Sequence, residues 1–190
     1  AVEANPEFCQ GIAKKFASRV SAGQLIIVNA AIIGQDGGKH SDFWINTEND
    51  AQSSLIPPSQ EDQFLTRIEV PTVSIHEVFQ EHGVPDYLKI DLEGYGQEML
   101  RALKAAERIP RTLSVEAHHL EVLAALRALE VFKAYKIVRG KSVSSRYREF
   151  SYIDKEGNPQ TFSFPWHSSG PVSDDLPGGW FAFRDAKKIS

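Results

Sequence analysis

Hydrophobic positions at the start of the chain predict a strand followed at once by a helix. Phe8, Ile12 and Phe16 recur at every fourth position, which is the stripe of a helix that packs on a sheet. Asn5 and the proline after it mark the start of this helix, because asparagine is a good N-cap and proline fits the first helical position. The strand before the helix is therefore expected to end at Glu3.

A continuous apolar run follows the first helix. Residues 24–33 (QLIIVNAAII) are rich in β-branched side chains and are followed by the glycines of residues 34–38, which predicts one strand buried on both faces, as in parallel sheets. Residues 39–50 alternate weakly and predict an added antiparallel strand. Residues 51–63 have the composition of a loop.

Strands and helices then alternate. Residues 67–83 predict a short strand and a helix that begins after Ser74 and ends at Gly83. Such alternation implies right-handed crossovers that cover both faces of an open sheet. The predicted fold class is thus α/β, with a doubly wound, mostly parallel sheet. Its other elements are a strand within 84–94, a helix over 95–108, a strand over 111–117, a helix carrying Val122, Leu123, Leu126 and Leu129, and a strand over 132–138.

The last part of the chain has a different character. Residues 140–190 are aromatic-rich and dense in glycine and proline, with a turn signal at 155–159, which predicts antiparallel strands and long loops packed on the same domain. A chain of 190 residues with 42% apolar residues suits one globular domain, and we expect residues 1–190 to form it.

Charge and cysteine content narrow the classes of function. The net charge is −4 and basic residues are scattered apart from 139–148, so the broad basic face of a duplex nucleic-acid binder is excluded. No apolar run is long enough to span a membrane and no signal peptide is visible, which predicts a cytoplasmic protein without a membrane partner. Cys9 is the one cysteine and lies on the apolar stripe, so we expect a buried side chain rather than a nucleophile. Oligomeric state stays open.

Acidic side chains follow several of the predicted strands. In open α/β sheets ligands bind outside the carboxyl ends of the strands, where a carboxylate can orient a hydroxyl, act as a general base or bind a hard cation. These carboxylates permit Mg²⁺ without requiring it. The alternative is that they cap the following helices or pair with Lys89. The candidate residues at this edge are Glu3, Asp91, Glu93, Glu116 and, just beyond it, His118.

Several segments resemble one protein family. Residues 84–103 (VPDYLKIDLEGYGQEMLRAL) and 111–117 (RTLSVEA) resemble the fourth strand, the helix and the fifth strand of FkbM-type methyltransferases. Residues 2–6 (VEANP) and 28–37 (VNAAIIGQDG) resemble the second and third strands of that family. Residues 168–180 (SSGPVSDDLPGGW) are similar to a closing segment found in part of it.

The resemblance implies a fold and a reaction. The family has the Rossmann-like fold of class I methyltransferases, uses S-adenosylmethionine and methylates hydroxyl groups of small molecules such as sugars or secondary metabolites. By this likeness Glu3 holds the cofactor ribose, and Asn29 and Ala30 border the adenine. Asp91 lies beside the methionine moiety and the acceptor, and either Asp91 or His118 is the general base.

The likeness places further residues around the acceptor. Glu93, Glu116 and His118 would surround the reacting hydroxyl. The tail would line the acceptor pocket with Trp166, His167, Ser169 and Trp180.

One feature of the family is missing from the chain. Its members begin with a strand and a glycine-rich turn against the cofactor, and neither precedes Glu3 here, which leaves the centre of the expected sheet incomplete. We therefore expect a longer parent protein, or another segment or chain in that place, and weak cofactor binding by this chain alone. Two alternatives remain: a non-catalytic binding or interaction module, and a nicotinamide-dependent oxidoreductase, for which no glycine fingerprint is present.

Overall fold

In the computed structural model, β1 (Val2–Glu3) leads directly into helix α1 (Pro6–Lys15). The Asn5 side chain caps α1 by accepting a hydrogen bond from the Glu7 N–H at 2.9 Å, and proline occupies the first helical turn. The predicted helix start is thus confirmed. A short helix, α2 (Ala17–Ser21), follows.

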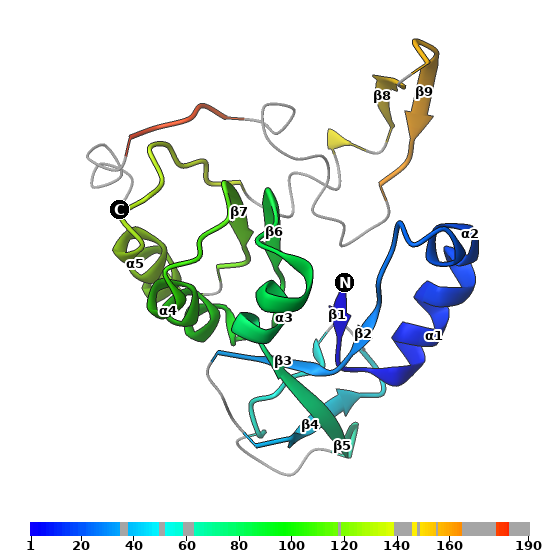
Figure 1. The fold of residues 1–190 in the computed structure, drawn as a ribbon, viewed down its shortest axis with the longest axis vertical. Helices are drawn as coiled ribbons and strands as arrows, with labels where there is room; N and C mark the ends of the chain where they lie inside the picture. Colours follow the sequence, from blue (N-terminus) through cyan, green and yellow to red (C-terminus); the bar gives the residue numbers. More distant parts are fainter. Residues whose placement is uncertain are drawn as a thin grey trace. The chain divides into compact units, whose positions relative to one another are not determined.

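The structure describes residues 1–34, 38–49, 52–58, 63–117, 119–138, 146–147, 149–154, 156–164 and 178–182. The chain divides into two compact units, Ala1–Val131 and Phe132–Ser190, and each is described by itself (Figure 1). The prediction of a single domain stays a prediction.

The apolar run of residues 24–33 forms two short strands, and the prediction of one continuous strand is wrong. β2 (Val28–Asn29) pairs in parallel with β1, whereas β3 (Ala31–Ile33) pairs in parallel with β5 (Leu65–Ser74). The run changes partner at Ala30, because the β1 ladder ends at Glu3 where the chain turns into α1. The Ala30 N–H still donates to the Glu3 carbonyl at 3.1 Å.

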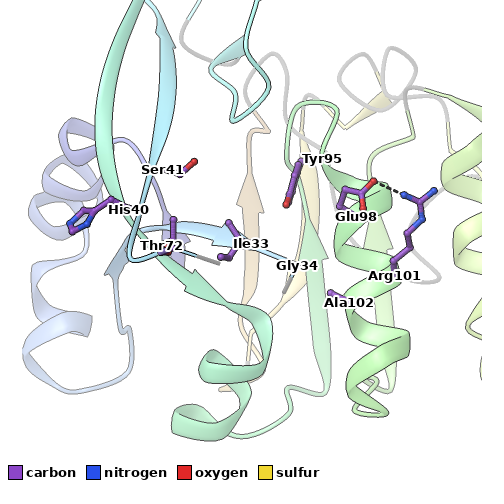
Figure 2. A pocket seen from close by; sticks show the side chains of 10 residues that line it. Ile33, Gly34, His40, Ser41, Thr72, Tyr95, Glu98, Arg101 and Ala102 are labelled. Atoms are coloured by element: carbon purple, nitrogen blue, oxygen red, sulfur yellow. Dashed lines mark hydrogen bonds and ion pairs between the residues drawn. The ribbon is translucent and has the colours of Figure 1, made fainter. Parts of the chain in front are cut away.

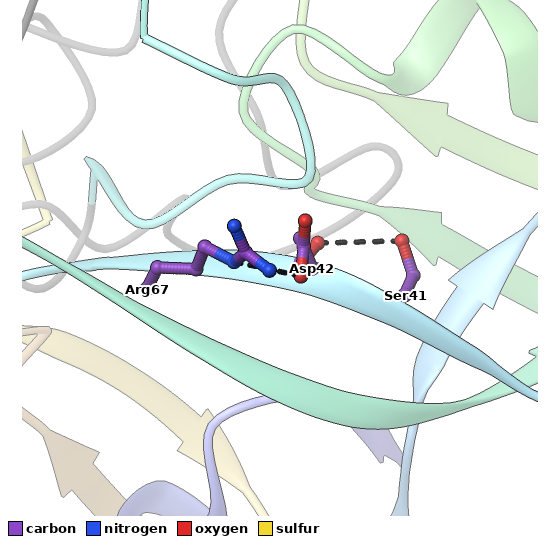
Figure 3. A network of polar contacts seen from close by, with 3 residues as sticks. All are labelled: Ser41, Asp42 and Arg67. Atoms are coloured by element: carbon purple, nitrogen blue, oxygen red, sulfur yellow. Dashed lines mark hydrogen bonds and ion pairs between the residues drawn. The ribbon is translucent and has the colours of Figure 1, made fainter.

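The predicted antiparallel strand is confirmed as β4 (His40–Asn46), which forms a ladder with β5 over its whole length. Asp42 faces Glu69 directly in this ladder, and two like charges in that position repel each other. Arg67 relieves the repulsion, because its Nε donates to Asp42 Oδ1 at 2.9 Å (Figure 3). Under this hairpin lies a small core of Ala31, Phe43 and Val70, against which Ala4, Ile45, Leu55 and Ile68 pack.

Helix α3 (Ile75–His82) begins and ends where the sequence predicts. Ser74 and Glu77 form a capping box: the Glu77 N–H donates to Ser74 Oγ at 3.2 Å, and the Ser74 N–H donates to Glu77 Oε2 at 2.7 Å. Ser74 is 1% exposed, whereas Glu77 lies on the exposed side of the helix, so only the N-cap half of the box is buried. Gly83 ends the helix with a positive φ of 82°.

The second half of this unit repeats the order of strand and helix. β6 (Tyr87–Ile90) leads to α4 (Gly96–Ala106), and β7 (Thr112–Val115) leads to α5 (Leu120–Ala128). β6 and β7 form a parallel ladder. The start of α4 lies close to β7, because a β-carbon on Gly96 would stand 3.1 Å from Val115 Cγ2. Met99, Leu100 and Leu103 carry the buried face of α4.

The predicted doubly wound parallel sheet is only partly seen. The strand order within the described residues is β1-β2 in one sheet, β3-β5-β4 in a second and β6-β7 in a third. Adjacent pairs are parallel where crossovers were predicted, and the mixed α/β class is shown. No ladder among the described residues joins β1 to β6, so one continuous Rossmann-like sheet stays a prediction.

The second unit contains the antiparallel pair predicted for the tail. β8 (Phe150–Ile153) pairs with β9 (Pro159–Phe162), and Asp154 closes the turn by accepting from the N–H groups of Glu156 and Asn158. Aromatic rings gather on this hairpin, with Phe162 and Phe164 at 4.9 Å between centroids. In the described part of residues 132–138, the predicted strand is reduced to one bridge between Tyr135 and Phe181.

Candidate functional site

The end of β1 gathers the residues predicted to bind the cofactor's nucleoside. Glu3 Oε1 accepts a hydrogen bond from the Asn5 N–H at 2.7 Å, which fixes the carboxylate at the strand end. Asn29 lies opposite Glu3 in the ladder, and its Nδ2 donates to the carbonyls of Glu3 at 3.0 Å and of Ala4 at 3.2 Å. Ala30 is 5% exposed directly beyond Asn29. Glu3, Asn29 and Ala30 are thus brought together.

Cys9 lies behind this strand end and is buried, as predicted. Its Sγ donates to the Glu3 carbonyl at 3.4 Å. Burial raises the pKa of the Cys9 thiol above its usual range, and the negative charge of Glu3 raises it further. A thiol that resists ionisation is a poor nucleophile, so Cys9 supports the fold here.

A second group of predicted residues lies where β6 and β7 end. Ile90 and Val115 are partners in the parallel ladder, and the Glu116 N–H donates to the Ile90 carbonyl at 3.1 Å. Asp91 and Glu116 therefore follow these partners at the same edge. Lys89 Nζ contacts Asp91 Oδ2 at 2.5 Å, and the side chains of this ion pair are 44% and 49% exposed. The pairing with Lys89 that the sequence left open is present.

Glu93 lies in the turn between β6 and α4. Its carbonyl accepts a hydrogen bond from Ser54 Oγ at 2.9 Å, a contact between residues 39 positions apart. The next residue, Gly94, has a positive φ of 75°, and a β-carbon there would stand 2.8 Å from Ile56 Cδ1. The turn that carries Asp91 and Glu93 is thus held from outside by the segment 52–58.

The two groups of predicted residues belong to different sheets. Glu3, Asn29 and Ala30 lie at the end of β1 and β2, whereas Asp91, Glu93 and Glu116 lie at the end of β6 and β7. His118 lies outside the described residues, and so do Trp166, His167 and Ser169 of the tail. Trp180 belongs to the second unit, where Lys136 Nζ lies 5.0 Å from its ring centroid.

Sequence reasoning missed a cavity of about 460 Å³ beside α4. Figure 2 shows side chains from β3, β4 and β5 and, facing them, side chains from α4. Arg101 Nη1 and Glu98 Oε1 form an ion pair at 2.5 Å on the helical side. Glu98, Arg101 and Ala102 are spaced to share one face of α4, and the sequence shows this spacing. It does not show which strand residues lie opposite that face. The lining residues are Ile33, Gly34, Gly38, His40, Ser41, Thr72, Tyr95, Glu98, Arg101 and Ala102.

The described residues contain neither a metal-site cluster nor a helix that could span a membrane. There, no cluster of three or more histidine, cysteine, aspartate or glutamate side chains has the arrangement of a metal site. None of the helices in the same residues combines the length and the apolar character needed to cross a membrane.

Comparison of the sequence with known proteins assigns the chain to one family. No curated protein and no solved structure matches the chain. The sequence profile of the methyltransferase FkbM domain, however, matches residues 1–137, which include both strand ends described above and all of α4. Because this match covers most of the chain, and because the acidic motif after β6 lies inside it, the chain belongs to the FkbM methyltransferase family.

Proposed function

We propose that the chain is an S-adenosylmethionine-dependent O-methyltransferase that acts on a hydroxyl of a small molecule such as a sugar or a secondary metabolite. Membership of the family supports methyl transfer. The observation that carries the proposal is the parallel register of Ile90 with Val115, because it brings Asp91 and Glu116 to one edge. Ligands bind at this edge in open α/β sheets.

The residues at the end of β1 fit a nucleoside. Glu3 is held by the Asn5 N–H through one oxygen, and a carboxylate at a strand end suits the hydroxyls of a ribose. Asn29 and Ala30 lie beside it and would border the adenine. Asp91 and Glu93 would lie near the methionine part. When bound, S-adenosylmethionine supplies an electrophilic methyl group on a positively charged sulfur.

The chain's own residues have to align the acceptor hydroxyl and remove its proton. The carboxylate of Asp91 is suited to accept that proton as a general base, and Glu116 would lie beside the reacting hydroxyl. Lys89 forms a half-exposed ion pair with the Asp91 carboxylate. His118 is a further candidate for the base. Positioning of this kind provides much of the rate enhancement in a displacement reaction.

The cavity beside α4 is a separate feature, because it is lined by none of the predicted site residues at the ends of β1 and β6. About 460 Å³ lies within the range of small-molecule sites, which is roughly 300–1,000 Å³. Ser41, Thr72 and Tyr95 are among its lining residues, and the hydroxyls of Ser41 and Thr72 donate to the carbonyls of Asp42 and Gly38.

Two measurements test the proposal. The first is calorimetric titration of the chain with S-adenosylhomocysteine, and the second is transfer of a labelled methyl group from S-adenosylmethionine to a panel of methyl glycosides and secondary alcohols. Glu3→Gln should weaken S-adenosylhomocysteine binding on the order of tenfold, because a charged hydrogen-bond acceptor is lost. Glu7→Gln is the matched control, since Glu7 is an exposed residue of α1. The affinity of this variant for S-adenosylhomocysteine should equal that of the wild type.

A non-catalytic methyltransferase-like module is the second candidate. The observation that favours it is that Glu3 and Asp91 end strands of different sheets, with no ladder among the described residues between those sheets. This candidate predicts that S-adenosylhomocysteine neither binds nor raises the unfolding temperature of the chain. Binding without methyl transfer to any compound in the panel would also favour it.

A further inference from the structure

The segment 52–58 connects the β4–β5 hairpin to the turn after β6. Ser54 forms a two-way antiparallel bridge with Trp44 of β4: the N–H of each donates to the carbonyl of the other at 3.0 Å. Ser53 adds a further contact with the same strand, because its Oγ accepts from the Asn46 N–H at 3.1 Å. The segment is therefore fixed to β4 at two consecutive residues.

The Ser54 hydroxyl links this fixed segment to the turn. Its Oγ donates to the Glu93 carbonyl at 2.9 Å and accepts from the Ile56 N–H at 3.1 Å. One hydroxyl thus uses both its donor and an acceptor lone pair, which fixes its direction. Ile56 reaches the same turn, since its Cδ1 lies 2.8 Å from the position of a β-carbon on Gly94.

The turn has little support from its own helix. The N-cap residue of α4 is Tyr95, and its side chain makes no capping hydrogen bond. Within the turn, the Tyr95 N–H donates to the Leu92 carbonyl at 3.0 Å. A contact from a distant, anchored hydroxyl can therefore decide the orientation of this backbone.

We infer that Ser54 is a positioning residue for the candidate catalytic carboxylate Asp91. By holding the Glu93 carbonyl, its hydroxyl sets the path of the backbone from Asp91 to Tyr95 and thereby the direction in which the carboxylate points. The catalytic meaning of this inference rests on the proposed function. The coupling between Ser54 and the turn does not, and it can be measured without substrate.

The experiment compares Ser54→Ala, Ser53→Ala and Ser54→Thr in the full chain. Ser53→Ala is the matched control, because Ser53 is a neighbour of similar burial whose hydroxyl contacts β4 and not the turn. Ser54→Thr keeps the hydroxyl and should rescue the wild-type behaviour. The readouts are hydrogen exchange at the Tyr95 amide, the carboxyl ¹³C chemical shift of Asp91 and the unfolding midpoint.

Ser54→Ala should speed hydrogen exchange at Tyr95 on the order of tenfold and move the Asp91 resonance, because one hydrogen bond to the turn is lost. Ser53→Ala should leave both readouts at the wild-type value while lowering the unfolding midpoint by a similar amount. Equal effects of the two alanine variants on the turn, or no effect of either, would overturn the inference. So would a threonine variant that behaves like alanine.

A functional arm separates this inference from the proposed function. If the wild-type chain transfers methyl groups, Ser54→Ala should lower kcat on the order of tenfold and leave the Kd of S-adenosylhomocysteine within about twofold. An unchanged kcat would overturn the positioning role. If the wild-type chain neither binds S-adenosylhomocysteine nor transfers methyl groups, the proposed function fails, and the exchange and resonance measurements still decide whether Ser54 orients the turn.

Discussion

The junctions at which two strands pass into helices, β5 into α3 and β6 into α4, are built in opposite ways. At the first junction the strand ends at Ser74 and the helix begins at the next residue, with a capping box formed by the buried Ser74 and the exposed Glu77. At the second junction a turn with a positive φ at Gly94 separates the strand from a helix that lacks a side-chain cap. The cap of the first junction comes from residues next to each other in the chain, whereas in the second the Glu93 carbonyl accepts a hydrogen bond from Ser54 of a distant segment.

The carboxylates at these junctions differ in the same way. Glu77 accepts from both the N–H and the hydroxyl of Ser74, so its charge stabilises the helix start. Asp91 instead forms a half-exposed ion pair with Lys89, and such pairs contribute little to stability. The comparison teaches that the carboxylate of Glu77 stabilises the start of its helix, whereas the ion pair of Asp91 adds little to the stability of the fold.

The largest expected effect is on catalysis at the second junction. Asp91→Asn should lower the rate of methyl transfer by about 10² to 10⁴, because a general base is lost while the shape is kept. Labelled methyl transfer measures this rate, with Glu77→Gln as the control at the other junction. An Asp91→Asn variant as active as Glu77→Gln would show that the contrast between the two carboxylates has no catalytic meaning.

A smaller effect concerns the turn itself. Gly94→Ala should destabilise the chain by about 1–2 kcal/mol, because alanine is strained at a positive φ, and the half-exposed end of the Ile56 side chain has to move to admit the β-carbon. Gly23→Ala is the matched control, since Gly23 has a φ of 68° with nothing within 4 Å of an added β-carbon. In urea unfolding, the free energy of unfolding of Gly23→Ala should lie between those of the wild type and Gly94→Ala. If the two variants are equally destabilised, Ile56 does not constrain the turn.

At the first junction the expected effect is on stability alone. Ser74→Ala removes the N-cap of α3 and should lower the free energy of unfolding by about 1 kcal/mol, within a range of roughly 0.5–2 kcal/mol. Ser74→Thr keeps a capping hydroxyl and should lose less. Both variants should retain S-adenosylhomocysteine affinity equal to that of the wild type, and a loss of affinity would mean that this junction also serves the site.

The smallest effect is a dependence of stability on pH. Hydrogen bonds from the backbone N–H and then the hydroxyl of Ser74 lower the pKa of Glu77 from its ordinary value of 4.5. A group whose pKa is lower in the folded state stabilises the fold above its unfolded pKa, and this contribution is lost as the pH falls through the folded value. Below about pH 4.5 the unfolding midpoint of the wild type should therefore fall more steeply than that of Glu77→Gln. Parallel curves for the two proteins would contradict the proposed role of the capping box.

Local signals explain what the sequence could predict. Asn5, Ser74 and Gly83 act on residues next to them in the chain, so the start of α1 and both bounds of α3 followed from short patterns. The shared edge of Asp91 and Glu116 followed from the order of strand and helix, because consecutive parallel strands are usually neighbours.

Contacts between distant residues explain what it could not predict. The bond from Ser54 to Glu93 spans 39 positions, and no pattern of residue types indicates it. At Ala30 the chain changes its strand partner from β1 to β5, and this change depends on where β1 ends and where β5 lies. The apolar residues of 24–33 do not indicate either position. The cavity beside α4 likewise depends on how far β3 and β5 stand from the helix.

The buried thiol of Cys9 can report local opening of the structure. Because it is the one thiol in the sequence and its sulfur bonds the backbone at the end of β1, a colourless disulfide reagent can reach it only when that corner opens. The rate of labelling then measures how often the end of β1 opens, with no mutation and no dye attached beforehand.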